Sequence, residues 1–213
     1  MTDSAILNES MSAEDIASLI KEDEKALPEA KGSLLSKRDD DLCSCVKYNS
    51  LKALLAVSEE TPEKLYSSFD FFVKLLDNDN AYLRFLAVKV IANLTKVDVQ
   101  NKFNEIFDKY YSMLGDKTSI VPAQVAGVSG KIVNFKPELE ERITNKLLEA
   151  ENICESRQKE LVKGYAVEAF GYYFKKAKEK DRIIEFVKGQ KNSESPTTRK
   201  KAREFLKMEE INI

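Results

Sequence analysis

The chain has 213 residues, of which 43% are hydrophobic and 33% charged, with a formal net charge of −2. This length suits one large domain or two small ones with a strongly solvated surface. The absence of histidine excludes a histidine-based triad, a histidine general base and metal sites that depend on imidazole.

The segment 1–38 is acidic at its start and contains one amphipathic stretch. Ile16, Leu19 and Ile20 fall on one face of a helix predicted over 12–25. The segment lacks the basic-then-apolar order of a signal peptide, and no apolar run in the chain approaches the roughly 20 residues of a membrane span. We therefore expect a soluble, cytoplasmic protein without a membrane-spanning segment.

The clearest periodicity lies between Leu75 and Leu94, where apolar residues recur at helical spacing. Asparagine and aspartate at 77–80 can cap the helix that follows, predicted over 80–95. Upstream, Pro62 opens a second helix predicted over 62–77. The unit is therefore a helix, a short polar loop and a second helix.

This unit recurs along the chain. Phe103 and Phe107 repeat Leu65 and Phe69 at a distance of 38 residues. The basic residue at the start of the second helix, Arg84, is matched at steps of 37, 38, 41 and 36 residues. These matches are Lys47, Pro122, Lys163 and Arg199. Further helices are predicted over 40–57, 99–114, 119–134, 137–150, 157–178, 180–189 and 196–208.

The pattern resembles the HEAT repeat, an armadillo-like family of helical repeats. The resemblance spans roughly residues 39–207 and is carried by apolar, acidic and basic positions in a fixed order. These positions are Leu75, Leu76, Asp77, Asp79, Leu83, Arg84, Ala87, Val90, Ile91 and Ala92. It implies an all-α fold, a right-handed α-α superhelix (α-solenoid) of about five helical-hairpin repeats.

We accordingly expect a repeat solenoid over 39–213, preceded by the acidic segment 1–38. A solenoid needs a terminal helix with a polar outer face, so the helix at 12–25 is interpreted as a cap. The alternative is that the acidic segment covers the binding groove and regulates it.

The resemblance also implies that the second helices line the concave side. Outward positions on them combine lysines with aromatic residues, which suits an acidic peptide or a phosphate backbone. The candidate partner-binding residues are Tyr48, Lys52, Phe85, Lys89, Lys96, Lys131, Tyr172 and Lys175. The alternative is a lysine-rich face that is merely solvated.

Three other motifs favour structural interpretations. Residues 127–131 (GVSGK) fail as a nucleotide-binding P-loop because Val125 and Ile132 replace the required glycine and hydroxyl residue. Small residues in a helix–helix contact explain this motif better. Asp77 and Asp79 are expected to pair with Arg84, and Cys43 with Cys45 offers too few ligands for a metal.

The function predicted is that of a non-enzymatic scaffold that binds another protein, with no cofactor and no metal. The alternative is a nucleic-acid-binding protein, including one similar to alkylated-base DNA glycosylases built on HEAT-like repeats. The chain has no tryptophan, and Glu168 is the one acid that we place among the groove aromatics, which weakens the alternative.

Overall fold

The computed structural model describes residues 5–36, 41–154 and 159–210, with the backbone alone for 41–44. Every regular element in these ranges is an α-helix or a 3-10 helix. Contacts divide the chain into two compact units, residues 1–97 and 98–213. Each unit is described by itself, as unit 1 and unit 2.

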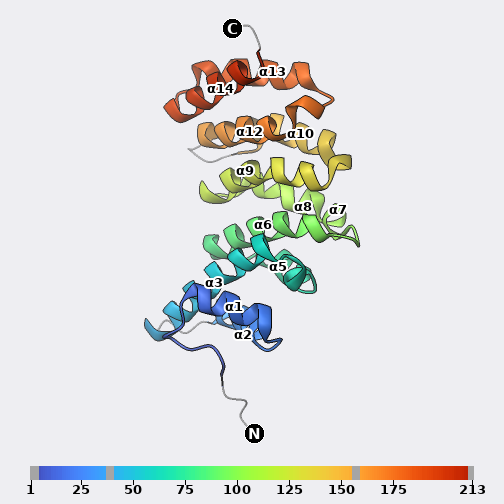
Figure 1. The fold of residues 1–213 in the computed structure, drawn as a ribbon. Coiled ribbons are helices and arrows are strands. Elements are labelled where there is room, and N and C mark those ends of the chain that lie inside the picture. The colour runs from blue at the N-terminus through green and yellow to red at the C-terminus, as the bar shows by residue number, and fades with distance from the viewer. Residues whose placement is uncertain (1–4, 37–40, 155–158, 211–213) are drawn as a thin grey trace. The chain divides into compact units, whose positions relative to one another are not determined.

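Unit 1 contains six α-helices among the described residues. They are α1 (Ala13–Glu22), α2 (Ala26–Leu35), α3 (Asp41–Glu60), α4 (Glu63–Tyr66), α5 (Phe69–Leu75) and α6 (Ala81–Leu94), followed by the 3-10 turn η1 (Thr95–Val97). Helices α1 and α2 lie against α3, and α3 lies against α6 (Figure 1). A capping box starts α1, because the side chains of Ser12 and Asp15 each accept the other's backbone N–H.

The segment before α1 is held in place although it forms no helix. The carboxylate of Glu29 on α2 accepts the backbone N–H groups of Ile6 and Leu7 at 3.0 and 2.9 Å. The second helix of this acidic segment, α2, ends at Leu35. The predicted boundary at 38/39 falls within 37–40, outside the described residues, and stays a prediction.

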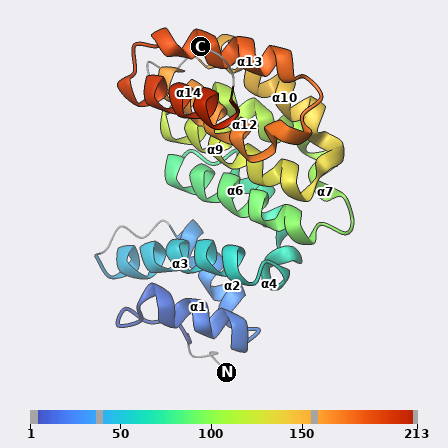
Figure 2. The ribbon, with the colours of Figure 1, turned by 45° about the horizontal axis from the view of Figure 1, so that its top comes forward.

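Unit 2 continues with hairpins of the same kind (Figure 2). Its first helices are α7 (Lys102–Glu105) with α8 (Phe107–Ser112), α10 (Glu140–Leu148) with α11 (Ala150–Ile153), and α13 (Lys180–Gly189). Its second helices are α9 (Ile120–Phe135), α12 (Lys159–Tyr173) and α14 (Pro196–Met208). Turns η2 (Met113–Gly115), η3 (Pro137–Leu139), η4 (Phe174–Lys176) and η5 (Gln190–Asn192) connect them. Helix α12 packs between α9 and α14.

The second helices therefore lie where the repeat predicts them, as α3, α6, α9, α12 and α14. Three first helices are divided where a single helix was expected: Glu149 separates α10 from α11, and the other two breaks lie at equivalent positions of their repeats. Ser68 (φ −99°, ψ 14°) separates α4 from α5, and Ile106 (φ −98°, ψ 4°) separates α7 from α8. Both breaks precede a phenylalanine, Phe69 or Phe107, that is about 1% exposed. The break at Ser68 thus recurs at Ile106, and in both repeats a buried phenylalanine ring follows it.

Glycines let neighbouring second helices of unit 2 approach closely. A Cβ atom added to Gly130 of α9 would lie 2.8 Å from the carbonyl oxygen of Ala169 and from Cδ2 of Tyr172 on α12. A Cβ on Gly127 would lie 3.1 Å from Cδ1 of Tyr165. The motif at 127–131 is thus part of a helix–helix contact, as its sequence suggested.

The basic residue at the start of a second helix binds the loop before it. Arg84 donates through Nη1 to the carbonyl oxygens of Asn78 and Asp79 at 2.7 and 2.9 Å. Arg199 does the same with Ser193 and Glu194, at 2.6 and 3.1 Å. These charge-assisted bonds satisfy carbonyl groups that the loop leaves unpaired, so the recurring basic residue is structural.

A buried ion pair fixes the turn before α7. Lys136, after α9, places Nζ 3.2 Å from Oδ2 of Asp98 and donates to the Asp98 carbonyl and to Oδ1 of Asn101 at 2.9 and 2.8 Å. The Asp98 carboxylate also accepts the backbone N–H groups of Lys102 and Phe103. The Asp98 side chain is 0% exposed, so its charge depends on these donors.

The close approach of α9 and α12 predicts opposite effects for two Gly→Ala substitutions. Gly130→Ala should lower the free energy of unfolding by about 1–3 kcal/mol, because a backbone carbonyl cannot swing away from the new methyl group. Gly171→Ala on α12 should raise it by about 0.5–1 kcal/mol, because alanine favours the helix and the nearest atom would be 4.0 Å away. Urea unfolding measures both, and equal effects would contradict this packing.

The buried ion pair predicts a large cost for removing its lysine. Lys136→Met should destabilise the protein by about 3 kcal/mol, because it leaves the Asp98 carboxylate buried without this ammonium group. The double variant Lys136→Met/Asp98→Asn should lose less than the sum of the two single variants. Denaturant melts complete this cycle, and additive losses would show that the two charges do not interact.

Candidate functional site

The predicted partner-binding residues of unit 1 form two aromatic–lysine pairs. On α3, Tyr48 is 58% exposed, and Nζ of Lys52 lies 4.4 Å from the centre of its ring. On α6, Nζ of Lys89 lies 5.8 Å from the centre of the Phe85 ring. Each lysine follows its aromatic residue by one helical turn, so both pairs are cation–π contacts within a helix.

These two pairs occupy equivalent positions of successive second helices. The four residues Tyr48, Lys52, Phe85 and Lys89 are called the aromatic–lysine face below. Lys89 also lies 3.7 Å from Oε1 of Glu59, at the end of α3, and is half-buried. Lys52 is exposed, as is Lys96 in η1. This face therefore offers both cationic and aromatic surface to a partner.

The predicted residues of unit 2 are exposed but differently surrounded. Lys131 on α9 and Lys175 in η4 are exposed, and Tyr172 on α12 is 59% exposed while it packs over Gly130. At the positions equivalent to the aromatic–lysine pairs, α9 has alanine and glycine, and α12 has glycine and Glu168. That all eight predicted residues line one groove stays a prediction.

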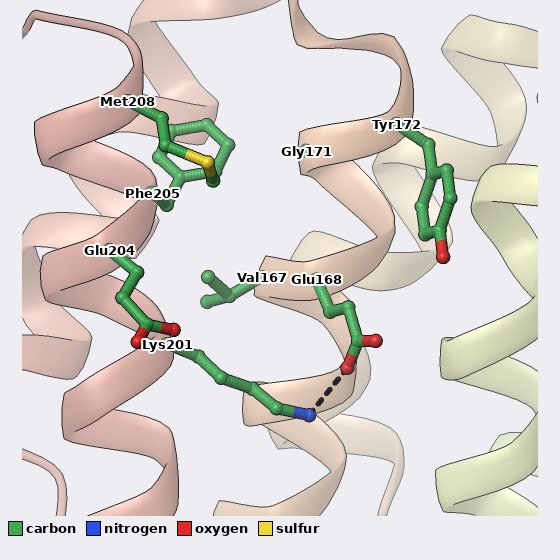
Figure 3. A pocket seen from close by; sticks show the side chains of 8 residues that line it. All are labelled: Val167, Glu168, Gly171, Tyr172, Lys201, Glu204, Phe205 and Met208. Carbon is green, nitrogen blue, oxygen red and sulfur yellow. Dashed lines mark hydrogen bonds and ion pairs between the residues drawn. The ribbon is translucent and has the colours of Figure 1, made fainter.

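A cavity between α12 and α14, which the sequence did not indicate, lies beside Tyr172 (Figure 3). Its volume is about 370 Å³. Buried apolar side chains form its floor, and acidic or exposed side chains surround it. It is lined by Val167, Glu168, Gly171, Tyr172, Lys201, Glu204, Phe205 and Met208. We call it the α12–α14 cavity.

Uneven spacing between the two helices accounts for this cavity. At one end, a Cβ on Gly164 would lie 2.6 Å from Oγ1 of Thr198, so the helices touch. Two turns further along α12, a Cβ on Gly171 would meet Phe205 at 4.0 Å. The helices leave room there, and a glycine adds no side chain to fill it. The sequence shows that residue 171 is a glycine, but not how far Phe205 of the neighbouring helix lies from it.

A second cavity of unit 2, about 400 Å³ in volume, is polar. Buried Lys163 pairs with Oε1 of Glu160 at 2.5 Å and with Glu151 at 3.5 Å. The Ser193 hydroxyl donates to Glu160, and the Thr198 hydroxyl donates to the Glu160 carbonyl at 2.6 Å. Burial raises the pKa of the Glu160 carboxyl, but the hydrogen bonds from Lys163 and Ser193 outweigh it and lower the pKa overall. This network joins the start of α12 to the start of α14.

The described residues show neither a metal-binding cluster nor a membrane-spanning helix. Among the described side chains, those of 5–36, 45–154 and 159–210, no group of three or more cysteine, aspartate and glutamate residues could hold a metal ion. None of the helices there is both long enough and apolar enough to cross a bilayer. Cys45 is an exposed thiol and Cys154 a buried one, while the Cys43 side chain is outside the described part.

Comparison with known proteins finds likeness in structure but not in sequence. No protein-family model and no curated protein matches the chain. A designed armadillo repeat protein is similar with a TM-score of 0.59 at 20% identity, over 96% of this chain and 89% of that one. A second, in complex with the peptide (KR)4, has a TM-score of 0.62 at 17% identity, over 96% and 88%. An engineered protein has a TM-score of 0.57 at 15% identity, over 93% and 84%.

At these identities the likeness concerns the fold alone. It confirms the fold expected from the repeat pattern, an all-α solenoid of armadillo- or HEAT-like repeats. Such repeats are typical protein-binding scaffolds, and the same fold can carry unrelated functions.

The lowered pKa of Glu160 predicts a pH-dependent contribution to stability. A depressed carboxyl pKa stabilises the fold above the unfolded value of about 4.5 and loses this effect as the pH falls through the folded pKa. Glu160→Gln should therefore destabilise the protein at pH 7 and much less near pH 3.5. Urea melts at both values test this, with Glu185→Gln at an exposed site of α13 as the charge control. An equal loss at both values would contradict the linkage.

Proposed function

We propose that this protein is a non-enzymatic binding module that holds a partner protein on the exposed faces of its second helices. The observation that carries the proposal is the repetition of an aromatic–lysine pair at equivalent positions of α3 and α6. One exposed pair is common on a helix. Two in consecutive repeats make a surface that an elongated partner can follow.

The charge of this face selects an acidic partner. Lys52 and Lys89 are cations, and each stands over an aromatic ring, so the ring restricts the motion of the ammonium group before binding. The structurally similar designed protein is in complex with the basic peptide (KR)4. A basic segment would be repelled by the lysines here, so we infer the opposite charge for this partner.

The distance between neighbouring second helices sets the distance expected between acidic residues along the partner. The axes of packed helices lie about 8–10 Å apart, and three residues of a polyproline II chain span about 9 Å and bring a side chain back to the same face. An extended segment with an acidic residue at every third position would therefore place one carboxylate near each lysine. Lys96 of unit 1 and Lys131, Tyr172 and Lys175 of unit 2 are proposed as further contacts.

The alternative of a nucleic-acid phosphate backbone is less well supported. A phosphate backbone is bound through several lysines and arginines, and the aromatic–lysine face carries two lysines. The net charge of −2 also gives little long-range attraction for a polyanion. We therefore treat nucleic acid as the competing outcome of the same experiment.

Removing the two lysines of the aromatic–lysine face should strongly weaken partner binding. The probe is a fluorescein-labelled peptide with four Glu-Gly-Ser units, and its Gln-Gly-Ser counterpart is the uncharged control. Lys52→Gln/Lys89→Gln should weaken its binding at least about tenfold, since both charged contacts are lost. Lys64→Gln/Lys74→Gln, at exposed sites of α4 and α5, changes the net charge equally and should leave binding intact.

The wild type and the two double variants are then used to capture partners from native lysate, with both protein and nucleic acid identified. A protein that the first double variant loses and the second retains supports the proposal. Nucleic acid lost in the same pattern would replace it with the alternative. Equal behaviour of the two double variants would show that these lysines are merely solvated. Thermal melts establish that all variants are folded.

A further inference from the structure

The α12–α14 cavity combines an apolar floor with large apolar side chains that face solvent. Val167 and Phe205 at its floor are 1% and 2% exposed, whereas Tyr172 and Met208 at its edge are 59% and 66% exposed. Figure 3 shows Phe205 and Met208 close together on α14, opposite Gly171 on α12. Exposed apolar groups beside a hollow of this size characterise surfaces that bind side chains of a partner.

The charges around the cavity are net negative. Glu168 and Glu204 contribute two carboxylates, and Lys201 contributes one ammonium group. Nζ of Lys201 is already engaged, at 2.6 Å from Oε2 of Glu168 and 4.0 Å from the centre of the Tyr165 ring. Glu204 pairs with Lys200 at 3.8 Å, but both side chains are more than half exposed, so water weakens that pair. A cation is therefore the complementary group.

The two walls of the cavity repeat one arrangement. On α12, Glu168 precedes Tyr172 by four residues, and on α14, Glu204 precedes Met208 by four residues. Four residues correspond to about 6 Å along a helix. Each wall thus carries an acid and, about one turn further on, an exposed side chain: the Met208 thioether on α14 and, on α12, the ring of Tyr172, which lies on the side of the helix away from α14 (Figure 3). A ligand helix with a basic and an apolar residue four positions apart would match both walls at once.

We propose that the α12–α14 cavity is a docking site for an amphipathic basic helix of a partner protein. An apolar side chain of that helix enters the cavity above Val167 and Phe205, and a lysine or arginine one turn away faces Glu168 and Glu204. This site goes beyond the aromatic–lysine face. It lies in the other unit and selects the opposite charge; Tyr172 at its edge is the one residue that it shares with the further contacts proposed for the acidic partner.

The test uses the whole chain and a defined peptide. The probe is a fluorescein-labelled peptide with two Lys-Ala-Ala-Ala-Leu-Ala-Ala-Ala units, which places lysine and leucine four positions apart throughout. Two control peptides replace the lysines with glutamate or the leucines with serine. Fluorescence polarisation should show binding of the lysine–leucine peptide and at least about tenfold weaker binding of both controls.

Filling the cavity gives the decisive variant. Gly171→Leu should block the site and weaken binding at least about tenfold, whereas Gly189→Leu, at the end of α13 where nothing lies within 4 Å of an added Cβ, should change binding less than about twofold. Glu168→Gln/Glu204→Gln should weaken binding of the lysine–leucine peptide by about tenfold. Equal binding by the two leucine variants would overturn the proposal. Helical circular dichroism verifies the fold of each variant.

Two further measurements distinguish this site from the aromatic–lysine face and from self-association. Lys52→Gln/Lys89→Gln should bind the lysine–leucine peptide like the wild type. The proposed function in unit 1 can therefore prove wrong while the docking site in unit 2 still holds. Sedimentation of the unlabelled protein should be the same for wild type and Gly171→Leu. Self-association that the leucine variant abolishes would identify a second copy of this chain as the occupant and overturn the proposed partner helix.

Discussion

Close contact between successive second helices is the constraint on which the other features of unit 2 depend. A single hairpin cannot bury the apolar face of its second helix, so each second helix must lie against the next. Glycine at 127, 130 and 164 removes the side chains that would hold these helices apart. Tyr165 and Tyr172 of α12 lie across the space gained on α9. Tyr172 is thereby placed at the surface beside the α12–α14 cavity.

The same contact shapes the two candidate binding surfaces. In unit 1 the equivalent positions carry Tyr48 and Phe85, each followed by a lysine, and this produces a cationic face. In unit 2 those positions are alanine and glycine on α9 and glycine and Glu168 on α12, so no equivalent pairs arise there. Helices α12 and α14 touch at Gly164 and separate towards Gly171. One repeat pattern thus yields a basic face in one unit and an acidic cavity in the other.

Buried polar side chains determine which charges remain for binding. Arg84 and Arg199 bind loop carbonyl groups, and Lys136 neutralises Asp98, so these recurring or buried basic residues serve the structure. Glu160, Lys163 and Ser193 likewise join two helix starts. A charge in such a network is costly to remove because its partner would remain buried. Lys52 of the aromatic–lysine face is exposed and Lys89 is half-buried beside the exposed Glu59. Neither belongs to a buried network of this kind, so mutation can test them separately.

The sequence by itself determined the helical class, the repeat period and the position of all five second helices, because helical periodicity records which residues of a helix are buried. It also placed Tyr48, Lys52 and Tyr172 correctly at the surface. The tertiary structure alone decided the breaks at Ser68 and Ile106, the helix α2, and the α12–α14 cavity. The cavity depends on the distance between side chains of different repeats, Gly171 and Phe205. Periodicity within one helix carries no information about such distances.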